Sequence, residues 1–240
     1  MALTKITGAG VGNVDSLGIG TASPTHSLEI DVNNDTANGY KQLALVGGRP
    51  TLFIKETRYN ANENYQIRVD NGVLKFQQQN DAQSDAITKM SIDQAGHVTM
   101  PTQPAFLAVS DTNQNDIAVD GLVQIAFGGE RFDNNGDWAS DIFTAPVTGR
   151  YMFSYFLNLR NMDADADYYL IRLSTSNKSY DLHKDFGFSS YDTVLWGQSA
   201  SIMVDMDASD TAKIQFYQAG GTAQTDLTGG EACFSGYLVC

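Results

Sequence analysis

Short stretches in which apolar and polar residues alternate recur along the whole chain, and glycine, asparagine and aspartate separate them. Alternation with a period of two places the apolar side chains of a strand on one face, whereas a helix needs apolar residues three and four positions apart. That helical spacing is almost absent from this chain. The pattern therefore predicts an all-β protein.

The alternating stretches fall into two groups on either side of residue 100. The first group predicts strands at residues 27–32, 42–46, 51–56, 65–69, 73–77, 86–92 and 97–100. The second predicts strands at 105–109, 121–127, 150–159, 168–173, 179–186, 194–204, 212–218 and 232–239. Asn71-Gly72 suits the two positive-φ positions of a type I′ hairpin turn, and residues 93–96 predict a second turn.

Composition along the chain predicts three segments. Residues 1–26 are rich in glycine and read as an extended anchoring arm, ordered only on a partner. Residues 27–100 predict a β-rich stalk or base. The two prolines in Met100-Pro101-Thr-Gln-Pro104 mark the boundary to a third segment, 101–240, because proline resists continuation of a helix or a central strand. Eight or more strands in about 140 residues suit a two-sheet jelly roll.

The predicted strands of residues 27–100 are short and carry many polar side chains. A single chain of this composition would have a thin apolar core. Fibrous β-structures solve this problem by burying the narrow apolar face of each chain against two others, so we expect an obligate homotrimer.

One corner of the third segment is the most specific feature of the sequence. In Phe143-Thr-Ala-Pro146-Val-Thr-Gly149-Arg-Tyr151-Met-Phe153-Ser154, an apolar run meets Pro146 and Gly149, and an aromatic alternation follows. This spacing predicts a strand, a tight turn and a second strand whose Tyr151, Phe153 and Tyr155 share one face. Such a corner closes a β-sandwich.

The same corner resembles the complement C-one-q head and tumour-necrosis-factor superfamily. The resemblance extends over residues 104–240 through Pro104-Ala-Phe106, Phe132-Asp133 with Gly136-Asp-Trp138, Ser199–Met206 with Thr211–Gln218, and Phe234-Ser-Gly236-Tyr237. It implies a ten-strand-type jelly-roll head that forms a homotrimer. Ser209-Asp210 replaces the usual Gly-Asp, and no collagen repeat precedes the head, which argues against a secreted collagen-like protein.

The first hundred residues resemble bacteriophage fibre proteins. Leu17-Gly-Ile19-Gly-Thr-Ala-Ser-Pro24 with Leu28-Glu-Ile30 is similar to repeats of tail fibres, and Met90–Pro101 resembles the short hairpin that joins such shafts to C-one-q-like heads. The resemblance implies a virion structural protein that is assembled in the bacterial host cytoplasm. The implied anchoring residues are Val14, Leu17, Ile19, Leu28 and Ile30.

The excess of acidic over basic residues is concentrated after residue 100. Residues 1–100 carry 8 basic and 10 acidic side chains, whereas residues 101–240 carry 7 and 18, and the whole chain has a net charge of −13. An acidic chain lacks the basic footprint of a nucleic-acid-binding protein. The acidity indicates either a solvated surface or binding of cations.

Three carboxylates at alternate positions, Asp163, Asp165 and Asp167, are the candidate cation site. They could converge on Ca²⁺, which prefers oxygen ligands. The alternative is a solvated acidic turn before Tyr168. The segment 133–137 has the same ambiguity, because Asx residues with glycine also form tight turns. No cofactor is otherwise indicated.

Aromatic residues in the predicted strands are the remaining feature that indicates core and interface positions. Neighbouring aromatics in a strand point to opposite faces, so one set fills the sandwich and the resemblance assigns the other to the threefold axis. The candidate core and trimer residues are Phe143, Tyr151, Phe153, Tyr155, Phe216, Tyr217, Phe234 and Tyr237. A ligand-contacting role for some aromatics is the alternative.

Other classes of function find little support in the sequence. His26, His97 and His183 are scattered, so a zinc site or a nucleophilic triad is not expected. No run reaches the roughly 18 apolar residues of a membrane helix, and the first residues lack the apolar region of a secretion signal. Cys233 and Cys240 on one strand would lie roughly 23 Å apart, too far for a disulfide.

Two functions remain open at this stage. The first is a tail fibre or receptor-binding protein that attaches to a glycan or protein of the host surface through exposed loops at residues 113–116, 133–137, 163–167 and 186–192. The second is a capsid decoration (cement) protein or head fibre. They differ in whether residues 1–26 bind the capsid shell or the tail or baseplate.

Overall fold

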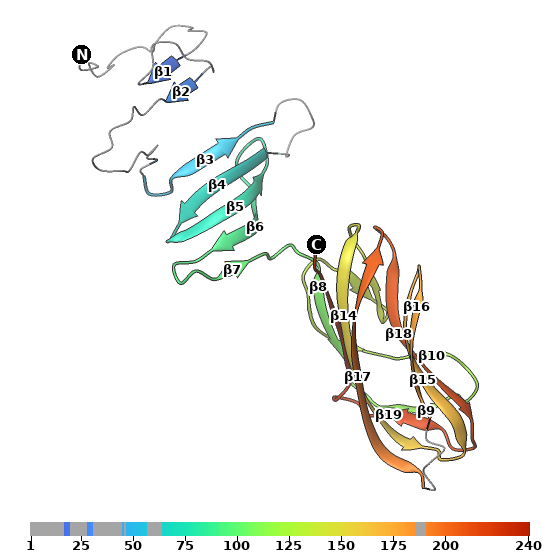
Figure 1. Ribbon diagram of the computed structural model, residues 1–240. Coiled ribbons are helices and arrows are strands. Elements are labelled where there is room, and N and C mark those ends of the chain that lie inside the picture. The colour runs from blue at the N-terminus through green and yellow to red at the C-terminus, as the bar shows by residue number, and fades with distance from the viewer. Residues whose placement is uncertain (1–16, 20–27, 31–44, 46, 57–63, 186–190) are drawn as a thin grey trace, which may run out of the picture. The chain divides into compact units, whose positions relative to one another are not determined.

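The computed structural model describes residues 17–19, 28–30, 45, 47–56, 64–185 and 191–240. Every regular element in these residues is a β-strand (Figure 1), so the all-β prediction is confirmed. No helix able to cross a bilayer occurs in the described part of the chain.

The backbone contacts divide the chain into two compact units, Met1–Pro50 and Thr51–Cys240. In the first unit, β1 (Leu17–Ile19) and β2 (Leu28–Ile30) form a parallel pair. The predicted strand at 42–46 lies almost wholly outside the described residues. The predicted boundary at Met100-Pro101 remains a prediction, although the chain passes there from one sheet to another.

The second unit begins with a five-stranded antiparallel meander. Its strands pair in chain order and are β3 (Thr51–Ile54), β4 (Asn64–Asp70), β5 (Val73–Gln79), β6 (Ala86–Ile92) and β7 (Val98–Thr99). Asn71 and Gly72 between β4 and β5 have φ values of 51° and 76°, as the predicted type I′ turn requires. Gly96, with φ of 87°, closes the second predicted turn, where its N–H donates to the carbonyl of Asp93.

A seven-stranded sheet forms one layer of the C-terminal sandwich. Its strands are β8 (Ala105–Val109), β9 (Gln114–Ile117), β11 (Gly129–Asp133), β14 (Gly149–Met162), β17 (Thr193–Met206), β19 (Thr225–Leu227) and β20 (Cys233–Leu238). The long strands β14 and β17 run side by side (Figure 1), and the other edge of β14 pairs first with β20 and then with β19.

A six-stranded sheet forms the other layer. Its strands are β10 (Val123–Gln124), β12 (Trp138–Ala139), β13 (Ile142–Thr144), β15 (Ala166–Thr175), β16 (Ser179–Lys184) and β18 (Thr211–Gly220). From β13 to β20 the chain crosses repeatedly between the two sheets. This connectivity is that of a jelly roll, which confirms the predicted fold class.

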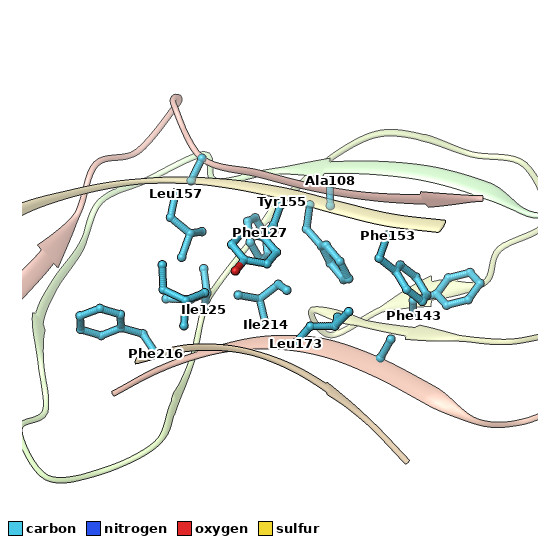
Figure 2. Close-up of a cluster of buried hydrophobic side chains, with 14 of the residues drawn as sticks. Ala108, Ile125, Phe127, Phe143, Phe153, Tyr155, Leu157, Leu173, Ile214 and Phe216 are labelled. Carbon is cyan, nitrogen blue, oxygen red and sulfur yellow. The ribbon is translucent and has the colours of Figure 1, made fainter. Parts of the chain in front are cut away.

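The apolar core lies between the two sheets, as Figure 2 shows. Phe106 stacks on Trp138 and Phe143 with ring centroids 4.8 and 4.9 Å apart, and Phe234 meets Phe106 edge-on. Offset and edge-on aromatic pairs contribute about 0.5–1.5 kcal/mol each beyond their burial. The aromatic alternation in the sequence therefore supplies the centre of the sandwich.

The corner between β13 and β14 carries the chain from one sheet to the other. The hydroxyl of Tyr151 donates to the carbonyl of Val147 across the corner at 2.7 Å. At Gly149 a Cβ atom would lie 2.7 Å from both the carbonyl oxygen of Cys240 and Cδ1 of Leu238. Glycine is needed at this position because the terminal strand passes too close for a side chain.

Candidate functional site

The outward face of the seven-stranded sheet is the candidate self-association surface. The core side chains Tyr151, Phe153 and Tyr155 of β14 alternate with Met152, Ser154 and Phe156, which therefore point away from the core. The strand register extends these three positions across the sheet as rows.

Two of the rows are mostly apolar, and the row between them is rich in serine. The first row contains Met203, Met152, Tyr237 and Ala105; the middle row contains Ser201, Ser154, Ser235 and Leu107; the third contains Ser199, Phe156, Cys233 and Val109. Met203 and Tyr237 are 50% and 51% exposed, which is high for large apolar or aromatic side chains. Phe132, on β11, pairs with Leu107 and extends the face.

Hydrogen bonds hold the middle row in place. The hydroxyls of Ser154 and Ser201 lie 2.7 Å apart, and the hydroxyl of Ser235 donates to the carbonyl of Ser154. These hydroxyls are paired across the strands, so burying them against a partner would cost less than burying unpaired hydroxyls. The face can therefore be covered by another protein surface without leaving these groups unsatisfied.

The structure distributes the eight candidate aromatic residues among three environments. Phe143, Tyr151, Phe153, Tyr155, Phe216 and Phe234 lie in the core. Tyr237 lies on the outward face of the seven-stranded sheet, among the rows above. Tyr217 points outward from the opposite, six-stranded sheet, so it cannot share one surface with Tyr237.

Asp163 is buried, and its carboxylate accepts hydrogen bonds from the backbone of two loops of the head. Its Oδ2 accepts the backbone N–H groups of Thr222 and Ala223 at 2.6 and 2.8 Å, and its Oδ1 accepts the N–H of Asp165 at 2.8 Å. Burial acts to raise the pKa of Asp163, but these three N–H groups outweigh it, and the pKa is lowered. The carboxylate thus remains charged and joins two loops.

Asp165 and Asp167 are exposed, in contrast to Asp163. No group of three or more His, Cys, Asp or Glu residues within the described ranges is arranged to hold a metal ion. The alternate spacing of the three carboxylates therefore does not bring them together as a ligand set. Calcium binding remains a prediction from the sequence.

The second ambiguous acidic segment forms a turn. Asp133 accepts the backbone N–H groups of Asn135 and Trp138 at 3.3 and 2.8 Å, and Gly136 has a positive φ of 76°. These are the contacts of an Asx turn. Close to it, burial raises the pKa of Asp137, and the negative charge of Asp133 adds to this effect.

Asp226 is a further structural carboxylate that sequence reasoning did not identify. It is 8% exposed, accepts the N–H of Asp116 at 2.7 Å and binds the amide of Asn161 at 2.8 Å. Asp116 and Asn161 both have positive φ values. Residues 113–116, expected to be an exposed loop, instead lie largely in strand β9, which pairs with β19. The partners of Asp226 are distant in sequence, so no local pattern could reveal them.

The outward face of the six-stranded sheet carries a smaller aromatic and charged group. The ring of Tyr168 lies 5.7 Å from His183 and 5.9 Å from Tyr217. Arg172 forms a bidentate pair with Asp181 at 2.7 and 2.8 Å, and this hydrogen bonding lowers the pKa of Asp181. The members come from β15, β16 and β18, which explains why sequence spacing did not bring them together.

The structure describes the backbone of four of the five predicted anchoring residues. Val14 lies outside the described residues, as does most of the arm 1–26. Leu17 pairs with Leu28, and Ile19 pairs with Ile30, in the parallel ladder of β1 and β2. Residues 186–190 of the expected contact loop 186–192 also lie outside the described part.

Comparison with known proteins gives structural likenesses only. No family model matches the chain, and no curated protein does. The globular domain of zebrafish complement 1qA protein is 20% identical, with a TM-score of 0.44, over 57% of this chain and 98% of that chain. Two crystal structures of murine APRIL, at pH 8.0 and pH 8.5, are 9% identical with TM-scores of 0.41 and 0.40, over 57% of this chain and 99% of theirs.

Proposed function

We propose that this chain is a non-enzymatic, homotrimeric surface protein of a bacteriophage virion, of the tail-fibre or receptor-binding type. The sandwich would be the projecting head, and residues 1–26 would attach the trimer to another virion protein. The observation that carries the proposal is the outward face of the seven-stranded sheet, where Met203, Tyr237 and Phe132 stand half-exposed around paired serines.

That face has the properties of a surface that another copy covers. Large apolar side chains gather on it in rows, whereas monomeric proteins rarely expose contiguous apolar patches larger than a few hundred Å². Homo-oligomers are usually symmetric and closed, so every copy would contribute the same sheet. Three copies, rather than two, follow from the sequence resemblance at residues 143–154 and 234–238.

Assignment to a phage virion rests on the first hundred residues. The fibre-like motifs at Leu17–Ile19, Leu28–Ile30 and residues 90–101 are the supporting features. A trimeric head would allow attachment by three weak sites at once, because linked binding sites gain affinity from effective concentration. The contact surface on a host glycan or protein would be the loops of the head.

The oligomeric state of the full chain tests the core of this proposal. Light scattering coupled to size exclusion should give a mass near three times the 26.1 kDa of one chain. A monomer at micromolar concentration would contradict the trimer.

Imaging of intact particles tests the location. Antibody-gold labelling of residues 101–240 at the tail or baseplate would support the attachment role. Labelling spread over the capsid shell would instead support the decoration role, in which residues 1–26 bind shell subunits and the head projects.

A further inference from the structure

The five-stranded sheet β3–β7 has one face made almost wholly of apolar side chains. The strand register arranges them in three rows: Ile54, Tyr65, Gln78 and Ile87; Leu52, Ile67, Phe76 and Met90; Val69, Leu74, Ile92 and Val98. Gln78 is the one polar residue among these twelve positions. None of these twelve positions carries a charged side chain.

This apolar face is open in the single chain. Leu52, Ile54, Tyr65, Val69, Ile87 and Val98 are 41–56% exposed. None of the residues that the structure describes covers them. Leaving such a face exposed to water is unfavourable, because each Å² of apolar surface removed from water stabilises the protein by about 25 cal/mol.

The opposite face of the same sheet is polar, and side-chain hydrogen bonds link three of its strands. The amide of Gln66 donates to Oε1 of Gln77 at 2.8 Å, and the amide of Gln77 donates to the hydroxyl of Thr88 at 3.1 Å. Gln66 and Gln77 are 3% and 6% exposed. The sheet therefore buries amides and exposes aliphatic and aromatic side chains, the reverse of an ordinary one-sided sheet.

The open face is as large as the largest apolar patches that monomers expose, and such patches are often functional. Strands about 4.8 Å apart and residues about 3.3 Å apart give five strands and three rows a flat footprint on the order of 400 Å². Contiguous apolar patches on monomers rarely exceed a few hundred Å². Three such faces brought together would enclose a shared core.

We infer that this face packs against the same face of other copies of the chain. An apolar surface whose three rows carry no charge needs a partner of the same character, and a second copy supplies it by symmetry. Residues 100–104 alone connect β7 to β8 of the sandwich. The inference rests on the head association proposed above. Once the heads associate, that short connection keeps three apolar faces at high effective concentration.

Photo-cross-linking from single positions in the full chain tests this inference. Ile87 is replaced by p-benzoylphenylalanine, which reacts with neighbouring C–H bonds on irradiation. We expect bands at about two and three times the 26.1 kDa chain mass, with peptides joining position 87 to residues 51–99 of another copy. Ile54, 55% exposed on the same face, provides a second position if the first variant folds poorly.

Position 86 is the matched control. Ala86 precedes Ile87 on the same strand, is also exposed, and points to the polar face. Little interchain product is expected from it. Equal cross-linking from positions 86 and 87 would overturn the inference, as would the absence of interchain product from 87 or attachment only to residues 1–46 of the same chain.

Position 203 separates this inference from the proposed head trimer. The same photoreactive residue at Met203 reports on the outward face of the sandwich. Products from 203 without products from 87 would leave the head trimer standing and overturn the stalk inference. Products from 87 alone would support the sheet interface and contradict the head interface.

Discussion

Single aspartates stabilise much of the loop structure of the head. Asp163 and Asp133 each accept several backbone N–H groups, and Asp226 accepts the N–H of Asp116 on the neighbouring strand β9. Such charge-assisted hydrogen bonds fix the backbone that the carboxylate contacts. The acidity of residues 101–240 thus has a structural use, in addition to any effect on solubility.

Asp163→Asn should destabilise the sandwich measurably. An amide offers one acceptor oxygen, so it cannot accept from both Asp165 on one side and Thr222 with Ala223 on the other. We expect a loss of about 1–3 kcal/mol in the free energy of unfolding, measured by urea denaturation. Asp165→Asn, at an exposed position of the same loop, is the control and should change stability by less than about 0.5 kcal/mol. Equal effects would contradict the assigned role.

The same carboxylate predicts a dependence of stability on pH. Its pKa is lower in the folded protein than the roughly 3.9 of an unfolded aspartate, so the unfolded state binds more protons in acid. The stabilisation is complete above about pH 4 and is lost as pH falls through the folded pKa. As the pH is lowered from 6 to 2.5, the melting temperature of Asp163→Asn should therefore fall less steeply than that of the native chain. Parallel curves would argue against this linkage.

At the scale of elements, the β13–β14 corner links sequence to fold most directly. Pro146 and Gly149 are visible in the sequence, and the aromatic alternation that follows predicts the core face of β14. The structure adds the reason for Gly149, which is the close passage of Cys240 and Leu238. That reason depends on residues ninety positions away and could not be read locally.

Gly149→Ala tests the closeness of this passage. The added Cβ would meet a backbone oxygen and a core side chain, so we expect a loss of about 1–3 kcal/mol in the free energy of unfolding. Gly121→Ala is the matched control, because a Cβ there meets nothing within 4 Å. Chemical denaturation of both variants provides the comparison. A neutral Gly149→Ala would show that the terminal strand can move away without cost.

Strands with regular alternation could be predicted, and short polar ones could not. The predicted strand at 150–159 corresponds to β14, and those at 194–204 and 212–218 correspond to β17 and β18. The strands β9, β11 and β19 were missed because each has five residues or fewer and a polar or charged composition. Their pairing comes from neighbours in the sheet rather than from their own pattern.

At the scale of the whole molecule, the outward faces of the two sandwich sheets differ in how far they could be predicted. The outward sheet face of the sandwich follows from alternation once the core face is known, so its members were partly predictable from the sequence. The aromatic group of Tyr168, Tyr217 and His183 was not, because three strands contribute one ring each. Contacts between strands distant in sequence determine both surfaces.

Met203→Glu should weaken the association of the heads. A carboxylate buried in an apolar interface loses its hydration and finds no partner there. We expect the dissociation constant to rise at least about tenfold, which corresponds to about 1.4 kcal/mol, as measured by light scattering over a dilution series. Gln215→Glu, outward on the other sheet, should leave the mass unchanged. An unaffected trimer in Met203→Glu would move the interface elsewhere.

The strand order also has a kinetic consequence. Each strand of the β3–β7 sheet pairs with its neighbour in sequence, whereas one edge of β8 pairs with β20, near the far end of the chain. Local pairings form faster than distant ones. We expect pulse-labelled hydrogen exchange during refolding to protect the amides of β4 and β5 before those of β8 and β20; the reverse order would disprove this sequence of events. During that interval, chains with a finished apolar sheet and an unfinished sandwich would be the species most prone to aggregate.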